Sequence, residues 1–409
     1  MSPAISGPAK FLNRFIAGRS VNFSCTRFVF SNAHASVAVE PSSSVTYEKL
    51  ADPFSGLSTQ IDEMHQKLRP SSEQLDERDE FILRLQRSID RVVDGAVVLP
   101  FGSAVNGFWS PNSDIDVCVQ LAGCRRRADQ VNALRKVANA LHSISSHFIE
   151  PRFGARVPII HWAPRRPGYL ACDISVNNNL AVVNSRLVGA YCRIDPRMAP
   201  LGMAIKHWAK SRGINDRSRG TLSSFSLLLM LIHFLQHRSP PILPSLQDLA
   251  LEHNEPLMYL DGADIRFMTD PLAIMDEMRR LECQGANDES LGKLFYEFFR
   301  YYGYEYKEGV IGIRDLRSFE IPACSSDRSH FLFIDNPFEV GKDVANVSSS
   351  QHVRIRQELR RAKSLIDEKG AKASIEEICS LAKLPTTGTK SAPHPLDPPM
   401  QVLGRKKKN

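Results

Sequence analysis

The sequence predicts an α+β fold in which a mixed sheet with packed helices is followed by a mostly helical domain. Residues 73–176 alternate between segments of helical period and short β-type runs, whereas nearly every long segment after Ser185 has a helical period. Hydrophobic residues make up 43% and charged residues 24% of the 409, a composition that can bury a core. At about 150 residues per domain, this length corresponds to two or three domains.

The first half of the chain supplies the sheet. A period near 3.6 residues predicts helices, and short runs rich in β-branched residues predict strands. In chain order we expect helices over 55–68 and 73–93, strands over 97–100 and 115–121, a helix over 126–148, and strands over 157–162 and 169–176.

The second half of the chain is predicted to be helical. Residues 238–270 are Pro-rich at their start and are expected to be a loop, and short strands are expected at 309–314 and 330–334. The expected helices cover 185–191, 200–212, 224–237, 271–283, 290–302 and 350–368.

The two ends are expected to lie outside the folded body. Residues 1–39 contain four basic and no acidic residues, with Phe11, Leu12, Phe15 and Ile16 on one face of a possible helix. This pattern favours a mitochondrial presequence, hence a location in the mitochondrial matrix, over an ordinary acid-free tail. Residues 384–409 are Pro-rich and end in four basic residues, which favours a disordered, solvated tail over a nuclear or nucleic-acid signal. The expected domains between these ends are 40–185, 186–345 and a helical segment at 346–383.

Overall charge carries little information about function. The formal net charge is +7, which alone invites a nucleic-acid partner, but the two terminal segments account for it. The longest apolar run, 227–232, is far shorter than the roughly 18 residues of a membrane span, so an integral membrane protein is excluded. The eight cysteines form no C-x-x-C pair and no zinc-finger spacing, so we expect reduced, buried thiols.

Three carboxylates carry the predicted chemistry. Gly102-Ser103 is followed after ten residues by Asp114-x-Asp116, and alternation on a strand places both Asp on one face, about 7 Å apart. Asp173 lies in another β-run and can join them from a neighbouring strand. Three carboxylates can hold two Mg²⁺ ions, with Mn²⁺ as a substitute, in the geometry of phosphoryl transfer. Gly102 allows close approach of the backbone to a phosphate, and Ser103 adds a hydroxyl donor.

This constellation resembles the nucleotidyltransferases of the DNA polymerase β superfamily. Further motifs look like those of the noncanonical poly(A) polymerases and terminal uridylyltransferases, and the resemblance covers roughly residues 75–365. It is strongest to the kinetoplastid mitochondrial uridylyltransferases, among them the small one associated with an editosome-like complex. The motifs lie at 177–180, 184–185, 204–210, 213–216, 221–230 and 337–339.

The resemblance implies a fold and an activity. The fold is a polymerase β-type catalytic domain followed by a poly(A)-polymerase-associated domain, with the nucleotide in the cleft between them. The activity is template-independent addition of UMP from UTP to RNA 3′-hydroxyl ends, with release of pyrophosphate, in mitochondrial RNA processing or editing. A monomeric catalytic unit within an editing-like complex is expected, without a membrane.

The resemblance also implies the residues that bind UTP. Lys206 and Lys210 lie four apart on one helix face and can reach the phosphates, although this spacing alone would suit an exposed face. Without the resemblance, Ser224 would be predicted as a helix N-cap and Phe225 as a core residue. In the family, the position of Phe225 is usually a Tyr that stacks on the base. The implied contacts are Gly102, Ser103, Ser113, Asn184, Ser185, Lys206, Lys210, Ser224, Phe225, Asn336 and Glu339.

Two positions leave the choice of base open. Uridylyl-specific members often have an acid where this chain has Asn336, and some place a His where it has Lys342. Glu339 can accept a hydrogen bond from uracil N3–H, while the Asn336 amide can both accept and donate. A poly(A) polymerase that uses ATP is therefore the nearest alternative, and an inactive scaffold of the same fold is the alternative from another class.

One basic segment favours RNA as the partner. Residues 121–166 contain nine Lys or Arg and two acidic residues, and in the family this region faces the RNA 3′ end. A solvated helix start explains the Arg125–Arg127 run equally well. The RNA-binding candidates are Arg125, Arg126, Arg152 and Arg156.

Overall fold

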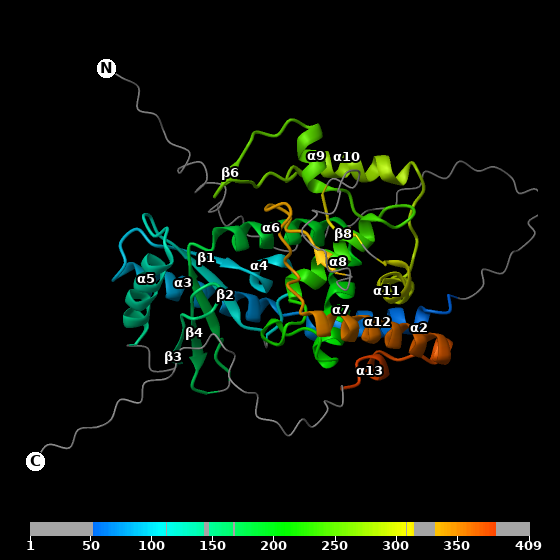
Figure 1. Ribbon diagram of the computed structural model, residues 1–409, viewed down its shortest axis with the longest axis horizontal. Coiled ribbons are helices and arrows are strands. Elements are labelled where there is room, and N and C mark those ends of the chain that lie inside the picture. Colours follow the sequence, from blue (N-terminus) through cyan, green and yellow to red (C-terminus); the bar gives the residue numbers. More distant parts are fainter. Residues whose placement is uncertain are drawn as a thin grey trace, which may run out of the picture.

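The computed structural model describes residues 52–111, 113–142, 147–166, 168–307, 309–314 and 332–381. The expected presequence at 1–39 and tail at 384–409 lie outside the described residues. In Figure 1 the sheet and its helices lie on the left, and the helical half of the chain lies on the right. Among the described residues, none of the helices combines the length and apolar character that a membrane crossing requires.

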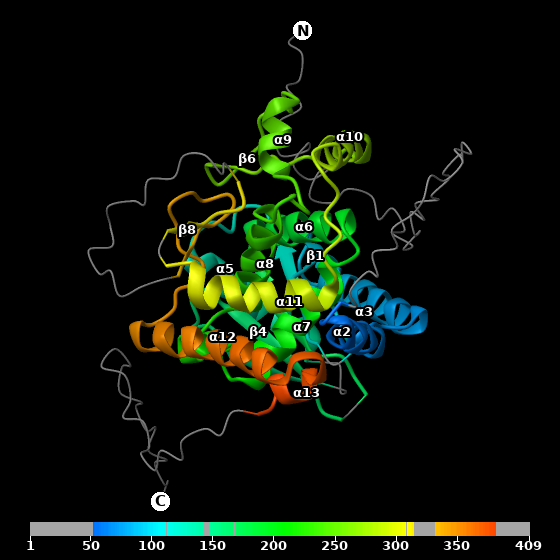
Figure 2. The same cartoon turned by 90° about the vertical axis from the view of Figure 1, so that its right-hand side faces the viewer.

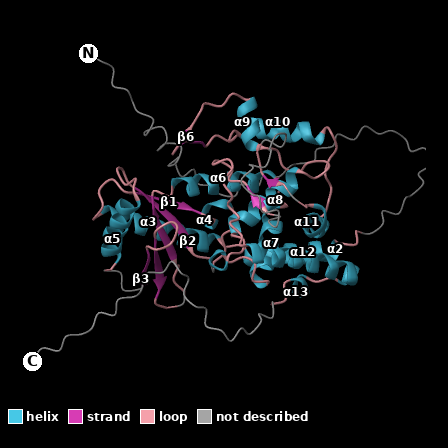
Figure 3. Ribbon diagram, viewed as in Figure 1, coloured by secondary structure: helices cyan, strands magenta, loops and turns pink. Residues whose placement is uncertain are grey.

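Five strands form one mixed sheet in the order β1-β2-β5-β4-β3. Figure 3 shows this sheet in magenta. The parallel pair β2–β5 lies at its centre, and the other neighbouring strands are antiparallel. The strands are β1 (Val97–Phe101), β2 (Ile115–Gln120), β3 (His147–Arg152), β4 (Ile159–Pro164) and β5 (Cys172–Val176).

The two faces of the sheet have different partners. Helices α3 (Ser72–Asp90) and α5 (Arg127–Leu141) cover one face, where Val117, Ile160 and Ile174 are buried against them. The other face carries Leu99 and Cys118, which pack on α6 (Asn179–Ile194). Because side chains alternate along a strand, Asp116 shares this second face with Cys118.

The helical half is built around α8 (Ser224–Gln236), which is buried from Ser226 to its end. Helix α7 (Met198–Ser211) packs on it, and α11 (Leu291–Arg300) contacts it through Phe298 and Phe234. Helix α12 (Ser349–Lys369) packs on α11 and on the π-helical turn Tyr301–Glu305 into which α11 continues; Figure 2 shows α11 and α12 side by side. The first helix, α2 (Ser55–Leu68), packs on α7 and α11, so it belongs spatially to this half. The remaining elements are α4 (Ser103–Asn106), α9 (Leu246–Glu252), α10 (Pro271–Glu282), α13 (Ile375–Ile378), β6 (Tyr259–Leu260), β7 (Ala263–Asp264), β8 (Val310–Ile311) and β9 (Phe333–Ile334).

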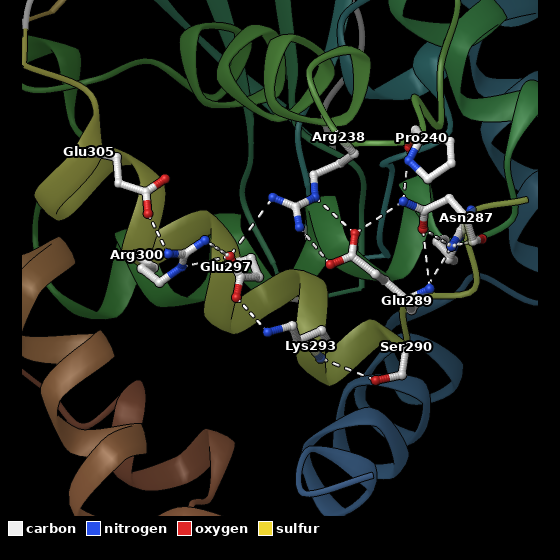
Figure 4. A network of polar contacts seen from close by, with 10 residues as sticks. Arg238, Pro240, Asn287, Glu289, Ser290, Lys293, Glu297, Arg300 and Glu305 are labelled. Atoms are coloured by element: carbon white, nitrogen blue, oxygen red, sulfur yellow. Dashed lines mark hydrogen bonds and ion pairs between the residues drawn. The ribbon is translucent and has the colours of Figure 1, made fainter. Parts of the chain in front are cut away.

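A chain of ion pairs ties the end of α8 to α11 (Figure 4). Glu297 has a side chain only 4% exposed and receives Lys293 at 2.6 Å and Arg300 at 2.6 Å. Arg238 pairs with Glu289 at 2.6 Å, and Glu289 also accepts from Asn287 at 3.1 Å. The buried Glu297 carboxylate is tolerated because Lys293 and Arg300 neutralise its charge.

The structure corrects three expectations. The helix expected over 126–148 ends at Leu141, and residues 147–152 instead form β3, because this segment pairs along its whole length with β4 and contains Pro151. The loop expected over 238–270 contains α9, which Ser245 caps, and the β6–β7 pair. The domain boundary placed after Ser185 falls inside the continuous helix α6.

The cysteine expectation holds in part. Within the described residues all six cysteines are free thiols, and Cys118, Cys172 and Cys379 are buried. Cys283, at the end of α10, is exposed, which the sequence pattern did not indicate.

Candidate active site

A lateral row of side chains crosses four strands of the sheet on the face that α6 covers. Strand register pairs Phe101 with Asp116, Asp116 with Asp173, and Asp173 with His161. Asp114 lies just before β2, two residues from Asp116. The sheet therefore brings together the three carboxylates predicted from their spacing, which we call the carboxylate row: Asp114, Asp116 and Asp173.

Like charge is concentrated in the carboxylate row. Burial, together with the nearby charges of Asp173 and Asp114, raises the pKa of Asp116 to about 7. Lys206 on α7 opposes this shift, and burial with the charge of Lys210 lowers the pKa of Lys206 itself to about 8. The three carboxylates thus carry more negative charge than Lys206 and Lys210 neutralise.

Asp114 and Asp173 of the row form, together with His161, a set of ligand atoms that fits a divalent cation. One ligand atom each from Asp114, Asp173 and His161 lies within 4.8 Å of the other two. Carboxylate oxygens are the ligands that Mg²⁺ and Mn²⁺ prefer. Sequence reasoning missed His161, although its place in the strand Ile159–Pro164, on the face opposite the buried Ile160, was a usable signal.

Gly102 is required where the chain turns from β1 into α4. Its φ is +63°, and a Cβ there would lie 2.3 Å from Asp116 Oδ2. The Gly102 N–H donates to Ser185 Oγ at 2.7 Å, and the Ser185 hydroxyl donates to the Ala181 carbonyl at 2.7 Å. Ser185, expected to contact the ribose, therefore holds the Gly102 turn in place.

The other residues expected at the phosphates and ribose border this turn. Ser103 begins α4 directly after Gly102, and the Ser113 hydroxyl is hydrogen-bonded to that of Ser110 at 2.8 Å. The side-chain oxygen of Asn184 is buried and has no hydrogen-bond partner among the described residues. A buried acceptor without a partner is rare in proteins, so this oxygen marks Asn184 as an unusual position beside Ser185.

Helices α7 and α8 supply the remaining predicted contacts. Lys206 reaches the Phe108 carbonyl at 3.5 Å, and Lys210 is exposed one turn further along α7. The N-cap of α8 is Ser223, whereas Ser224 donates to Asn215 Oδ1 at 3.2 Å. Phe225 is half-buried and packs against the main core.

The late motif forms a compact turn between β9 and α12, which we call the base loop (residues 335–343). Asn336 is 4% exposed, and its side-chain oxygen accepts from the Phe338 and Glu339 N–H groups at 3.0 and 3.2 Å. Its amide nitrogen donates to Glu339 Oε2 at 2.9 Å, and Lys342 donates to Glu339 Oε1 at 2.8 Å. Every polar atom of the Asn336 side chain is thus engaged within the loop.

Buried side chains hold the base loop from outside the motif. Asp335 accepts from the Gly341 N–H at 2.7 Å, and burial raises its pKa. Gln247 on α9 donates to the Pro337 carbonyl at 2.6 Å. Sequence reasoning missed Gln247, because α9 lies in the segment that was expected to be a loop.

The candidate RNA contacts divide into two kinds. All four are exposed, but Arg126 pairs with Asp129 at 3.2 Å and Arg152 with Glu150 at 3.0 Å, whereas Arg125 and Arg156 form no ion pair among the described residues. Burial, followed by the charge of Arg156, lowers the pKa of Arg217, so these two cations from different halves of the chain lie near each other.

Comparison with known proteins identifies the family. The central palm domain of mitochondrial-like poly(A) RNA polymerase matches residues 57–193, and the Cid1 family poly A polymerase model matches residues 290–341. The crystal structure of Cid1 poly(U) polymerase with MgGTP is 28% identical, with a TM-score of 0.67 over 80% of this chain and 99% of that chain. The chain belongs to the Cid1-like nucleotidyltransferase family. The prediction of an α+β fold, with a palm domain followed by a poly(A)-polymerase-associated domain, is confirmed.

Cid1-like relatives carry both uridylyltransferase and poly(A) polymerase names. Poly(A) RNA polymerase cid11 of Schizosaccharomyces pombe is 30% identical over 77% of this chain and 64% of its own length. Human terminal uridylyltransferase 4 is 34% identical over 68% of this chain, which spans only 17% of that relative. Terminal uridylyltransferase cid1 of S. pombe is 28% identical over 84% of this chain and 87% of its own length.

Proposed function

We propose that this Cid1-like protein is a template-independent RNA uridylyltransferase that transfers UMP from UTP to an RNA 3′-hydroxyl. The observation that carries the proposal is the carboxylate row, in which three acids share one sheet face beside Lys206. Such crowding is explained if cations and a polyphosphate occupy the site. Cid1 structures with the UTP analogue UMPNPP and with the short product ApU support this choice of ligands.

The residues of the row and its surroundings divide the work. Asp114, Asp116 and Asp173 would hold divalent cations, which supply Lewis acidity at the phosphates and lower the pKa of the attacking hydroxyl. Lys206 and Lys210 neutralise charge on the β- and γ-phosphates, and Gly102 lets the backbone approach them. The RNA 3′-oxygen then bonds to the α-phosphorus as the bond to the bridging oxygen breaks, and pyrophosphate leaves.

The base loop supports UTP as the nucleotide. One N–H of the Asn336 amide, which left the choice open in the sequence, donates to Glu339, and Asn336 is only 4% exposed, so Glu339 is the more accessible partner for a base. Glu339 keeps unused lone pairs on both oxygens and can accept from uracil N3–H. Asn336 thereby influences the choice of base indirectly, because its hydrogen bond orients Glu339.

A poly(A) polymerase is the second candidate. Lys342 stands where some uridylyl-specific relatives place a His that blocks adenine, and the cid11 relative bears a poly(A) polymerase name. A scaffold without activity is disfavoured, because such a protein has no need to keep three acids together at the cost of raising the pKa of Asp116.

A panel of the four NTPs tests the proposal. The full chain is incubated with each NTP, Mg²⁺ or Mn²⁺, and a labelled single-stranded RNA, and the products are resolved on a gel. We expect extension with UTP that exceeds extension with ATP by at least tenfold, and loss of extension in Asp114→Ala. Preferential extension with ATP would establish the poly(A) alternative, and no extension with any NTP would favour the scaffold.

Location and partners complete the proposal. We propose a mitochondrial matrix protein that acts in RNA processing or editing within a protein complex, as the acid-free residues 1–39 and the resemblance to kinetoplastid enzymes suggest. Import into isolated mitochondria tests the first part: removal of residues 1–39 is expected to abolish import. Import that is unchanged by the truncation would contradict it.

A further inference from the structure

His161 is a polar group of the site to which the proposed reaction gives no role. Its Nδ1 lies 2.6 Å from Asp173 Oδ1, and the two side chains are 16% and 25% exposed. The antiparallel register of β4 and β5 places the two residues directly opposite each other. The contact is therefore set by the sheet.

The distance indicates a hydrogen bond between these groups. Two ligand atoms that bind one Mg²⁺-sized ion at right angles, each about 2.1 Å from it, lie about 3.0 Å apart. The separation of 2.6 Å is shorter than that and lies just below the roughly 2.7–2.9 Å of a charge-assisted N–H···O hydrogen bond, so it fits a short hydrogen bond better than two ligands of one ion. Since a carboxylate only accepts, Nδ1–H is the donor, and a neutral imidazole is sufficient.

Asp173 depends on this contact for its orientation. Among the described residues, no donor other than His161 is hydrogen-bonded to its carboxylate. Asp116, by contrast, is held against the Gly102 backbone. The bond from His161 restricts rotation of the Asp173 carboxylate and leaves it further lone pairs for a cation, with a carboxylate oxygen of Asp114 within 4.8 Å.

We propose that His161 is a positioning residue that orients Asp173 for a divalent cation shared with Asp114. The inference rests on the proposed function only in taking that cation to be the one the transfer requires, and cation binding is measured without RNA or UTP. Loss of such an outer partner typically weakens metal affinity about 10–100-fold.

Side-chain geometry provides the test. The amide nitrogen of Asn occupies the position of His Nδ1, whereas that of Gln lies one bond further out, so His161→Asn preserves the donor and His161→Gln displaces it. Mn²⁺ binding to the full chain is measured by electron paramagnetic resonance. We expect roughly 10–100-fold weaker binding in His161→Gln and His161→Leu, and binding within about threefold of wild type in His161→Asn. Wild-type affinity in His161→Leu would overturn the proposal, and so would a wild-type chain that binds no Mn²⁺.

A fourth variant separates positioning from direct ligation. His161→Asp supplies an oxygen ligand but no hydrogen-bond donor, so we expect it to bind Mn²⁺ as poorly as His161→Gln. Tight binding in His161→Asp together with loss in His161→Asn would show that His161 is a ligand. If His161→Leu does not fold, the Asn and Gln variants still decide the matter. Mn²⁺ binding with this pattern but without UMP transfer would overturn the proposed function and leave this inference standing.

Discussion

The carboxylate row and the base loop are built on opposite principles. In the row, strand register places Asp116 beside like charges, and burial together with the charges of Asp173 and Asp114 raises its pKa to about 7. In the base loop, Asn336, Glu339 and Lys342 satisfy one another through hydrogen bonds. The row thus requires ligands to compensate its charge, whereas the loop is held by protein groups, its own side chains together with Gln247 of α9. We therefore expect the proposed chemistry to depend on rigid strands and the proposed base selection to depend on individual side chains.

Gly102→Ala is expected to have the largest effect, because it disturbs the row directly. The new Cβ would lie 2.3 Å from Asp116 Oδ2, so the carboxylate must move. Displacement of a catalytic group by about 1 Å can cost about 100-fold in rate. We expect kcat for UMP addition to fall at least about 100-fold, measured at saturating UTP and RNA.

Gly123→Ala is the matched control. Gly123 also has a positive φ, +78°, but a Cβ there meets nothing within 4 Å. Both variants place an Ala at a positive φ, which strains the backbone, and only Gly102→Ala adds the clash with Asp116. Equal losses of kcat in both variants would mean that strain, and not the position of Asp116, controls the rate.

Low pH tests the contact that α8 makes, through His233, with the backbone next to β8. His233 on α8 is buried, and its Nδ1 donates to the Gly312 carbonyl at 2.8 Å, next to the strand β8 that pairs with β9. Burial, together with His237, lowers the pKa of His233 to about 3. The unfolded chain takes up a proton near pH 6.5 and the folded chain does not, so stability falls as the pH drops below about 6.5.

The expected slope is at most about 1.4 kcal/mol per pH unit between pH 6.5 and about 3. His233→Asn keeps a donor for Gly312 and removes the titration. Urea unfolding of both proteins at pH 7 and pH 5 isolates this contribution: we expect wild type to lose about 2 kcal/mol more than the variant. Parallel losses would show that His233 is protonated in the folded protein.

Asn336→Ala tests the hydrogen bonds within the base loop. The change leaves the Phe338 and Glu339 N–H groups without their acceptor and releases Glu339 Oε2. An unsatisfied buried group costs about 1–3 kcal/mol. We expect kcat/KM for UTP to fall about tenfold, the preference for UTP over ATP to shrink, and kcat with Mn²⁺ to change little. Asn132→Ala, at an exposed position on α5, is the control, and a fall in kcat alone would contradict the division of roles.

The sequence was sufficient for the elements whose pattern is local. The spacing of Asp114 and Asp116, and the Gly102-Ser103 turn, are visible in consecutive residues. Ser55–Leu68 was predicted with the same bounds that the structure gives to α2, because its period is regular. These features depend on alternation and period, which single-sequence patterns preserve.

The features that the sequence could not provide depend on pairing across the sheet or between helices. His161 becomes part of the site only through the β4–β5 register, and β3 was missed because its pairing with β4 overrides a helix-like pattern. Ser185 and Asn336 were assigned to the ligand, yet the structure uses their polar atoms to hold Gly102 and Glu339. Polar residues in a motif can thus act on one another, which no linear spacing shows.

Lys342→Ala is expected to have the smallest effect, and it sharpens the comparison most closely. Lys342 and Glu339 form an exposed ion pair at 2.8 Å, and such pairs contribute about 0–1 kcal/mol. Asn336 still fixes Glu339 Oε2 after the change, so we expect kcat/KM for UTP to stay within about threefold of wild type at 150 mM salt. A loss above tenfold, confined to UTP and not seen with ATP, would mean that the ammonium contacts uracil itself. In that case Lys342 would resemble the acids of the carboxylate row, because its charge would be fully compensated only when the substrate is bound.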